Sequence, residues 1–308
     1  KKKTNSKVTI WQRDPLKTSQ IINSKTHPRF KNFKIPASIK FTSSLNDLDF
    51  NELTIIAIPT SSIRDVLPKK LKNGKYIIAS KGFDLNTGLL CSEMLQSDFN
   101  LDSNNIAILS GPNHAEEDIA GKASAAVIAS SNSKLSSSLQ ELFSSDIFRV
   151  YRSDDILGVQ IGAAVKNVIA IASGLCVGLN LGDNAQAALV SRGMNEIMNL
   201  TRIYSIDERT LYGLSGLGDL IATCYSKYSR NRELGILLAE GYSIDDAKNK
   251  IGMISEGINT SKILNNISKS NNLDMPICTE VYKILFEGNE PQKSLYRLMT
   301  RSLKEENN

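Results

Sequence analysis

The chain has 308 residues, of which 41% are hydrophobic, enough to build two cores of ordinary size. The net charge of +5 comes from dispersed lysines that are not interleaved with aromatic residues, which argues against nucleic-acid binding. No stretch reaches about 18 continuous apolar residues and no signal-like segment opens the chain, so we expect no membrane span. The four cysteines, Cys91, Cys176, Cys224 and Cys278, are widely spaced, which indicates neither a zinc site nor a disulfide framework. We expect them to be reduced thiols in a cytoplasmic protein.

The first half alternates short apolar runs with polar or helical stretches, a pattern typical of buried parallel strands. The predicted strands are Val8–Trp11, Thr54–Ile58, Tyr76–Ala79, Ile106–Leu109 and Ser124–Ala129. Three of them end in turns where open α/β sheets bind their ligands, namely Pro59-Thr60-Ser61, Ser80-Lys81-Gly82 and Ser110-Gly111-Pro112-Asn113.

The serine-rich stretch Ser130–Ser138 predicts a loop and the start of a helix. From about Asp154 onward the periodicity is helical, with Asp154 and Asp155 suited to the first turn of a long helix. We therefore expect an α/β domain over residues 1–153 and an all-α domain over residues 154–308.

Lys166 lies in a helical run, Gly158 to Gly174, whose other polar residues are Gln160, Asn167 and Ser173. A helix so apolar is expected to be buried nearly all round. Burial disfavours the charged form of an ammonium and lowers its pKa, which suits a lysine to proton transfer. The alternative is a lysine whose stem follows the apolar surface while its head reaches water.

A second polar group lies between Gly213 and Gly235. Asp219 and Thr223 are four residues apart, so on a helix they share one face and can orient an amine or a hydroxyl. Ser229-Arg230-Asn231-Arg232 forms a cluster of donors suited to an oxyanion such as phosphate. The same four residues also fit an N-cap followed by a solvated basic turn. Together with Lys166, these residues favour a site for a small phosphorylated alcohol or ketone.

Ten segments in order give the chain a resemblance to bacterial NAD(P)-dependent glycerol-3-phosphate dehydrogenases. They are VTIWQRDP, IAIPTSSIRDVL, IASKGFDLNTGLL, ILSGPNHAEE, FRVYRSDDILGVQIGAAVKNVIAIASGL, LGDNAQAALVSRGMNE, GLSGLGDLIATC, YSRNRELG, MISEGINT and MPICTEVYKILFEG. The resemblance implies a Rossmann-like domain followed by a helical domain. It also implies interconversion of dihydroxyacetone phosphate and sn-glycerol 3-phosphate, which supplies phospholipid synthesis, and a homodimer.

The resemblance assigns site residues wherever the motifs match. Lys166 resembles the catalytic lysine, a general acid or base toward the C2 oxygen. The residues implied to contact the substrate are Lys81, Gly111, Asn113, Lys166, Asp219, Ser229, Arg230 and Asn231. Those implied to contact the nucleotide are Lys81, Ala115, Arg230, Ile254 and Glu256. Asn113 departs from the family, which more often has serine or threonine there.

Arg13, which follows the first predicted strand, bears on the choice between NADP and NAD. A cation at this position accommodates the 2′-phosphate of NADP, whereas an acidic side chain would bind the ribose of NAD. Asp14 follows directly, so the signal is mixed; it favours NADPH and leaves NADH open.

The larger departure from the family is at the start of the chain, where its first strand and glycine-rich turn are not found. Residues 1–7 align with the end of the helix after that turn, so we expect the sheet to have a gap. Either the start was mis-assigned or cut, or the chain is a natural truncation; we favour the first, because the downstream site residues remain. Binding of NADPH with ordinary affinity by these 308 residues would contradict this expectation.

Two alternatives to this function remain open. Related two-domain reductases act on keto acids such as ketopantoate, and Arg230 could hold a carboxylate as well as a phosphate. A truncated relative could also persist as an inactive binding module or dimer partner.

Overall fold

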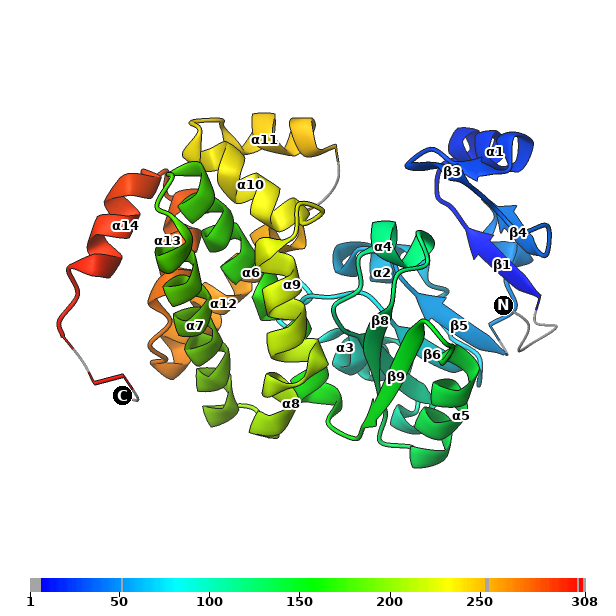
Figure 1. Ribbon diagram of the computed structural model, residues 1–308. Helices are drawn as coiled ribbons and strands as arrows, with labels where there is room; N and C mark the ends of the chain where they lie inside the picture. The colour runs from blue at the N-terminus through cyan, green and yellow to red at the C-terminus, as the bar shows by residue number, and fades with distance from the viewer. Residues whose placement is uncertain (1–6, 51, 253–254, 304, 307–308) are drawn as a thin grey trace.

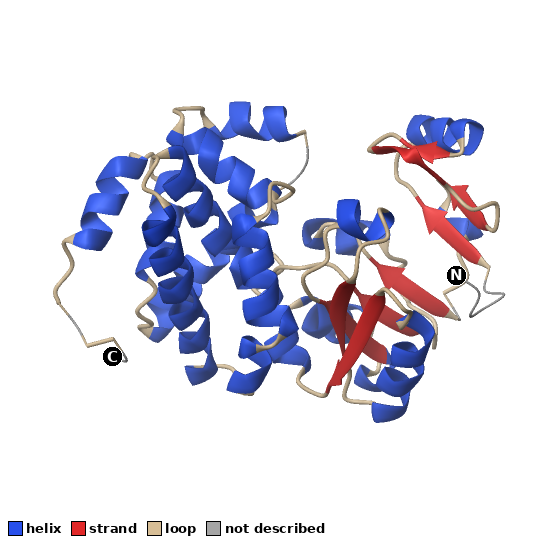
Figure 2. Ribbon diagram, viewed as in Figure 1, coloured by secondary structure: helices blue, strands red, loops and turns tan. Residues whose placement is uncertain are grey.

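A computed structural model describes residues 7–50, 52–252, 255–303 and 305–306. The strands lie in the first half and the long helices in the second, as Figure 2 shows. The expected fold class, a Rossmann-like α/β half followed by an all-α half, is confirmed.

The described strands of the first half form a five-stranded sheet and two small two-stranded sheets. The large sheet has the order β5 (Leu53–Ile56), β6 (Lys75–Ile78), β7 (Ile106–Ser110), β8 (Ser124–Ala129) and β9 (Phe148–Ser153). Strands β5, β6 and β7 are parallel, so their carboxyl ends meet at one edge, where the loops that follow them can build a site.

Two packed layers cover this sheet. Helix α3 (Cys91–Phe99) and the short α2 (Ile63–Val66) pack on one face through Met94, Leu95 and Ile63. Helix α5 (Ser133–Phe143) packs on the other face through Leu135 and Leu139. The serine-rich stretch therefore becomes the start of α5, as expected.

The gap expected in the sheet separates β1 (Val8–Trp11) from β5. Strand β1 pairs in parallel with β4 (Ile39–Thr42), and within the described residues neither strand is hydrogen-bonded to the five-stranded sheet. Figure 1 shows this pair, with α1 (Pro15–Ser24), set apart from β5. Ile10 of β1 is 38% exposed and Ile55 of β5 is 49% exposed, as expected of strand edges that lack a neighbour.

The strand predictions were incomplete. Four strands were missed, namely β2 (Thr26–His27), β3 (Phe30–Lys34), β4 and β9. The expectation that all strands are parallel was wrong for β8, which runs antiparallel to β7. An apolar run such as Ser124–Ala129 has the same pattern in either direction, because both of its faces are covered.

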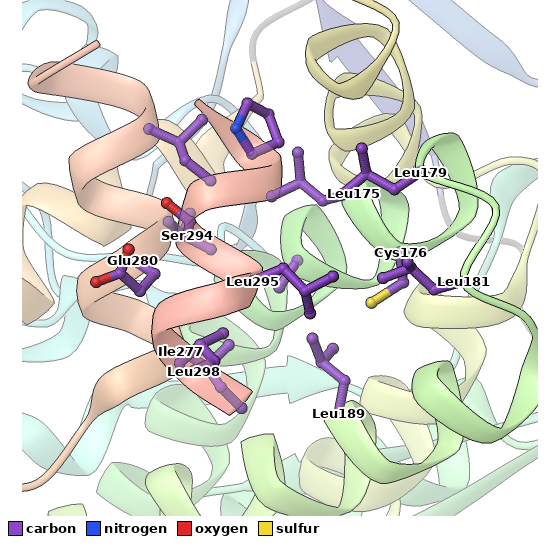
Figure 3. Close-up of a pocket in the computed structure, with 14 residues that line it drawn as sticks. Leu175, Cys176, Leu179, Leu181, Leu189, Ile277, Glu280, Ser294, Leu295 and Leu298 are labelled. Atoms are coloured by element: carbon purple, nitrogen blue, oxygen red, sulfur yellow. The ribbon is translucent and has the colours of Figure 1, made fainter. Parts of the chain in front are cut away.

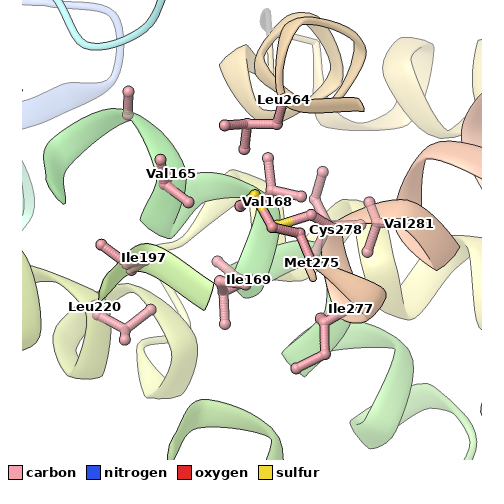
Figure 4. Packing of buried hydrophobic residues seen from close by; sticks show 14 of the residues in the cluster. Val165, Val168, Ile169, Ile197, Leu220, Leu264, Met275, Ile277, Cys278 and Val281 are labelled. Atoms are coloured by element: carbon pink, nitrogen blue, oxygen red, sulfur yellow. The ribbon is translucent and has the colours of Figure 1, made fainter. Parts of the chain in front are cut away.

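The second half is built around helix α6 (Ile156–Gly178), which is buried from Gly158 to Cys176. Asp155 caps α6, its Oδ1 accepting the Gly158 N–H at 2.8 Å. Figure 4 shows Val165, Val168 and Ile169 of α6 within this core. Among the described residues, α6 alone is long and apolar enough to cross a membrane, and 89% of its most apolar window is buried, as in a core helix.

The remaining helices surround α6 in Figure 1. They are α7 (Asp183–Met198), α8 (Glu208–Tyr212), α9 (Asp219–Tyr225), α10 (Arg230–Ala239), α11 (Ile244–Ile251), α12 (Glu256–Asn271), α13 (Pro276–Phe286) and α14 (Pro291–Met299). Helix α4 (Ala115–Ile119) belongs to the first half. An apolar pocket lies between α6, α7, α13 and α14, lined by leucines that Figure 3 displays.

Candidate active site

The amine of Lys166 is buried at the centre of α6, where its residue is 5% exposed. Its Nζ donates to Asp219 Oδ1 at 2.6 Å and to Thr223 Oγ1 at 2.8 Å. The alternative in which the head of this lysine reaches water is therefore wrong, because two buried partners hold it inside the helical half.

Helix α9 presents both partners. It follows a π-helical turn, Leu214–Gly218, a local irregularity that often occurs at functional sites. Asp219 is the first residue of α9 and Thr223 lies one turn later on the same face, as their spacing predicted. The Thr223 hydroxyl also bonds to the Asp219 carbonyl at 2.6 Å, which fixes the two side chains relative to each other.

Lys81 reaches this pair from the sheet half. It lies in the loop after β6, and its Nζ donates to Asp219 Oδ2 at 2.8 Å and to the Gly111 carbonyl at 3.4 Å. Gly111 has φ +153°, and a Cβ there would lie 2.8 Å from the Ala125 carbonyl oxygen, so the loop after β7 needs glycine. One carboxylate thus holds two lysines, one from each half.

Burial and neighbouring charges shift the proton affinities of these groups. Burial lowers the pKa of Lys166 to about 8, with Asp219 opposing that shift and Lys81 adding to it. Burial alone would raise the pKa of Asp219, but the two ammonium groups hold it below its ordinary value. The pair is therefore a carboxylate beside a lysine that can release its proton near neutral pH.

The predicted donor cluster lies at the N-terminus of α10. Ser229 is its N-cap and accepts the Arg232 N–H at 3.2 Å, so the N-cap interpretation is confirmed for this residue. Arg230 is half-buried, and burial, then the charge of Arg29, lowers its pKa. Asn231 Nδ2 donates to Asn167 Oδ1 at 3.0 Å, which joins the cluster to the residue after Lys166.

A pocket opens beside Lys81, between the end of β5 and α12. Its walls include Thr60 and Ser61, which follow β5, and Glu256, the first residue of α12. Burial raises the pKa of Glu256 to about 7, while the charges of Arg230 and Lys81 oppose the rise. The pocket thus combines hydroxyls, an amine and a carboxyl that titrates near neutral pH.

The other predicted site residues make no hydrogen bond to Lys166, Lys81 or Asp219 within the described residues. Arg13 is exposed in the turn between β1 and α1, and Ala115 is exposed at the start of α4. Asn113 Nδ2 donates to the Ala125 carbonyl at 3.2 Å, so part of its amide serves the loop itself. Ile254 lies outside the described residues.

The sequence analysis placed Thr60 in a ligand-binding turn and named Asn167 as a polar residue of the helix, but it assigned no site role to either, or to Ser255. A signal existed for Asn167, because it is one of three polar residues in an otherwise apolar helix. The other two also bond to neighbouring elements: Gln160 Nε2 donates to the Ser92 hydroxyl at 2.7 Å, and the Ser173 hydroxyl donates to the Cys224 carbonyl at 2.9 Å. Within a buried helix, polar residues thus mark where other helices attach.

The four cysteines are free and buried. Burial raises the pKa of the Cys224 thiol, which is near Lys166, to about 12. A thiol with such a pKa is protonated at neutral pH and is a poor nucleophile, so the reaction chemistry rests on the amines and carboxyls.

A Rossmann-like half and a helical half that meet at a buried lysine define a two-domain dehydrogenase. The profile of the N-terminal domain of NAD-dependent glycerol-3-phosphate dehydrogenase matches residues 1–136, and that of the C-terminal domain matches residues 155–296. The chain belongs to the NAD-dependent glycerol-3-phosphate dehydrogenase family.

Individual relatives agree with this assignment. A glycerol-3-phosphate dehydrogenase [NAD(P)+] of Thermoanaerobacter sp. (strain X514) is 38% identical over 97% of this chain and 91% of its own length. The crystal structure of glycerol-3-phosphate dehydrogenase from Coxiella burnetii is similar at 30% identity, with a TM-score of 0.87 over 96% of this chain and 92% of that chain. A ketopantoate reductase from Ralstonia eutropha is 11% identical, with a TM-score of 0.55 over 94% of this chain and 92% of its own, which shows a shared fold alone.

Proposed function

We propose that this protein transfers hydride reversibly between NAD(P)H and C2 of a three-carbon phosphate. The substrates are dihydroxyacetone phosphate in one direction and sn-glycerol 3-phosphate in the other. The observation that carries the proposal is the buried Lys166 amine, bonded to Asp219 and Thr223 and tuned to a pKa of about 8. The relatives that bear this activity in their names support it.

In this proposal, the nicotinamide end of the cofactor binds at the pocket beside Lys81. It lies at the carboxyl ends of β5 and β6, where open α/β sheets bind nucleotides, and its carboxyl and hydroxyls can bond to a carboxamide. In our proposal Lys81, Ala115, Arg230, Ile254 and Glu256 contact the nucleotide. When bound, the cofactor supplies the hydride. Arg13 would favour NADPH by contacting its 2′-phosphate, and NADH is the alternative cofactor.

Lys166 would act as the general acid during ketone reduction. Negative charge grows on the C2 oxygen as hydride arrives at the carbon, and a protonated Nζ can neutralise that charge by donating its proton. With a pKa of about 8, most Lys166 is protonated at neutral pH and can act as the acid. The neutral amine then serves as the base for oxidation of the alcohol, and Asp219 holds it in place in both directions.

The phosphate would be held by the turn before α10 and by the loop after β7. Arg230 and Asn231 offer N–H donors to its oxygens, and a guanidinium forms charge-assisted hydrogen bonds with phosphate. Ser229, Gly111 and Asn113 complete the proposed substrate contacts. Anchoring the phosphate fixes the carbonyl relative to Lys166, so that binding energy from a remote group serves the reacting centre.

We further propose a division into domains at residue 153, which the end of β9 at Ser153 and the start of α6 at Ile156 support. We also propose a cytoplasmic homodimer that supplies glycerol 3-phosphate for phospholipid synthesis; the family supports this proposal, and the apolar helices of the second half are compatible with it.

Replacement of the lysine tests the function directly. We expect Lys166→Ala to lower kcat for dihydroxyacetone phosphate by at least about 100-fold, the usual contribution of a general acid. Lys262→Ala is the matched control, because Lys262 is exposed on α12. NADPH oxidation is followed by absorbance, with ketopantoate as a second substrate for the parent enzyme.

Two results would contradict the proposal. Near-parental turnover by Lys166→Ala would remove this lysine from the chemistry. Faster oxidation of NADPH by ketopantoate than by dihydroxyacetone phosphate would favour a keto-acid reductase.

A further inference from the structure

The amide of Asn231 is held in one orientation by its surroundings. Its Oδ1 accepts the Gly257 N–H at 3.1 Å and the Ser255 hydroxyl at 2.5 Å, and its Nδ2 donates to Asn167 Oδ1 at 3.0 Å. A backbone N–H can only donate, so the atom that faces Gly257 has to be the amide oxygen. Both lone pairs of this oxygen are therefore used, and the NH₂ group of Asn231 is turned toward α6.

The Ser255 hydroxyl bonds to a residue of another helix and not to its own helix. It occupies the N-cap position of α12, where a serine oxygen ordinarily accepts an N–H from the first turn of its own helix. Here it makes no such bond, and Asn231 of α10 accepts the Gly257 N–H instead. The N-termini of α10 and α12 are thus joined through one amide, with Ser255 holding that amide from the other side.

Gly257 is necessary for this close approach. A Cβ at this position would lie 2.7 Å from Asn231 Oδ1 and 2.8 Å from the Asn167 carbonyl oxygen. Ser255 itself is 4% exposed, so no bulk water competes for its hydroxyl. The contact is therefore a packed junction of α6, α10 and α12.

Each member of this junction is next in sequence to a charged residue of the site. Asn167 follows Lys166, Asn231 follows Arg230, and Ser255 precedes Glu256. Moving the junction would therefore move the phosphate-binding turn relative to the catalytic lysine. Lys166 bonds to Asp219 and Thr223, which are not part of this junction, so the Lys166 amine should be little affected.

We propose that Ser255 is a positioning residue for phosphate recognition. Its hydroxyl fixes the Asn231 amide against α6, the helix that carries Lys166. Through this amide it also fixes the turn before α10, which carries Arg230. The inference rests on the proposed function, in which Ser229, Arg230 and Asn231 hold the substrate phosphate. Ser255 acts through Asn231, so its removal weakens substrate binding and leaves the chemical step largely intact.

Kinetics of Ser255→Ala test this role. We expect KM for dihydroxyacetone phosphate to rise about 2- to 10-fold, the usual scale for one lost hydrogen bond, with kcat changed less than about 2-fold. Ser261→Ala is the matched control: Ser261 is a buried serine on the same helix whose hydroxyl donates to the Ile258 carbonyl at 2.8 Å. Thermal unfolding of both variants verifies that they fold.

A double-mutant cycle separates positioning from a general packing effect. If Ser255 acts through Asn231, then Ser255→Ala adds nothing to KM in an Asn231→Ala background. Additive effects of the two substitutions would overturn the proposal. So would a KM for Ser255→Ala equal to that of Ser261→Ala, or a loss confined to kcat.

Binding of inorganic phosphate, measured by titration calorimetry, distinguishes this inference from the proposed function. A rise in Kd for phosphate in Ser255→Ala, and not in Ser261→Ala, supports the role of Ser255 even if dihydroxyacetone phosphate is not the substrate. An unchanged Kd in an enzyme that does reduce dihydroxyacetone phosphate overturns the role of Ser255 and leaves the function standing.

Discussion

The substitution Asp219→Asn should lower the pKa of Lys166 while leaving the position of the Lys166 side chain largely unchanged. The carboxylate accepts one lysine on each oxygen, at 2.6 Å for Lys166 and 2.8 Å for Lys81. An amide of the same shape has one oxygen and one NH₂ group, so one of the two ammonium groups loses its acceptor. The charge that favours protonated Lys166 is also lost, and the pKa of Lys166 should fall below about 8.

The size of the effect follows from the hydrogen bond that is lost. A hydrogen bond to a charged group contributes about 1.5–3 kcal/mol. At 1.36 kcal/mol per pKa unit, its loss lowers the pKa of Lys166 by about one to two units. At about pH 8, the protonated fraction then falls from about one-half to between about one-tenth and one-hundredth, so ketone reduction slows about 5- to 50-fold.

The assay is kcat for NADPH oxidation by dihydroxyacetone phosphate between about pH 6 and pH 9. In the parent, reduction should decline as pH rises through about 8; in Asp219→Asn the decline should move to lower pH, with activity largely recovered at the acid end. Asp274→Asn is the control, because Asp274 pairs with Arg301 at the surface. An equal loss at every pH would refute the reasoning, since the carboxylate would then act on geometry alone.

Two further predictions concern stability. Gly174→Ala should lower the free energy of unfolding in urea by about 1–3 kcal/mol, because its Cβ would lie 2.0 Å from the Arg232 carbonyl and force α10 away from α6; an unchanged midpoint would contradict this packing. Glu196 accepts the N–H groups of Ile277 and Cys278, and burial raises its pKa to about 7 from 4.5. Between pH 4.5 and about 7 the folded state therefore binds one proton more than the unfolded state, and the free energy of unfolding should fall as pH rises through this range. In Glu196→Gln, whose side chain does not titrate, this fall with pH should be absent when its unfolding is compared with that of the parent.

The buried contact between Lys166, Asp219 and Thr223 could be predicted from the sequence because its signals are local. Lys166 is conspicuous as a charged residue in an apolar helix, and Asp219 and Thr223 lie one helical turn apart. Both inferences require the 3.6-residue period and no knowledge of how the helices are arranged. The start of α6 was predicted only approximately: Asp154 and Asp155 were expected in its first turn, whereas the helix begins at Ile156 and Asp155 is its N-cap.

The parts that could not be predicted depend on tertiary arrangement. Ser255 and Asn231 are 24 residues apart, and nothing in either segment indicates that one helix caps the other. The reversed direction of β8 likewise leaves no mark on its residues, because both faces of the strand are covered. Strands β2 and β3 pair with an irregular register and none of their residues is fully buried, so they lack the apolar pattern that identifies buried strands.

The arrangement of charges makes the acid strength of Lys166 a property of both halves together. Asp219 and Lys166 belong to the helical half, whereas Lys81 reaches Asp219 from the loop after β6. Burial is the main cause of the lowered pKa of Lys166; Lys81 lowers this pKa further by repulsion and shares the carboxylate that raises it. Separation of the halves would remove the repulsion and leave Asp219 to Lys166 alone, so the proton would be held more tightly. The pKa of Lys166 therefore depends on how the sheet half, which carries Lys81, lies against the helical half.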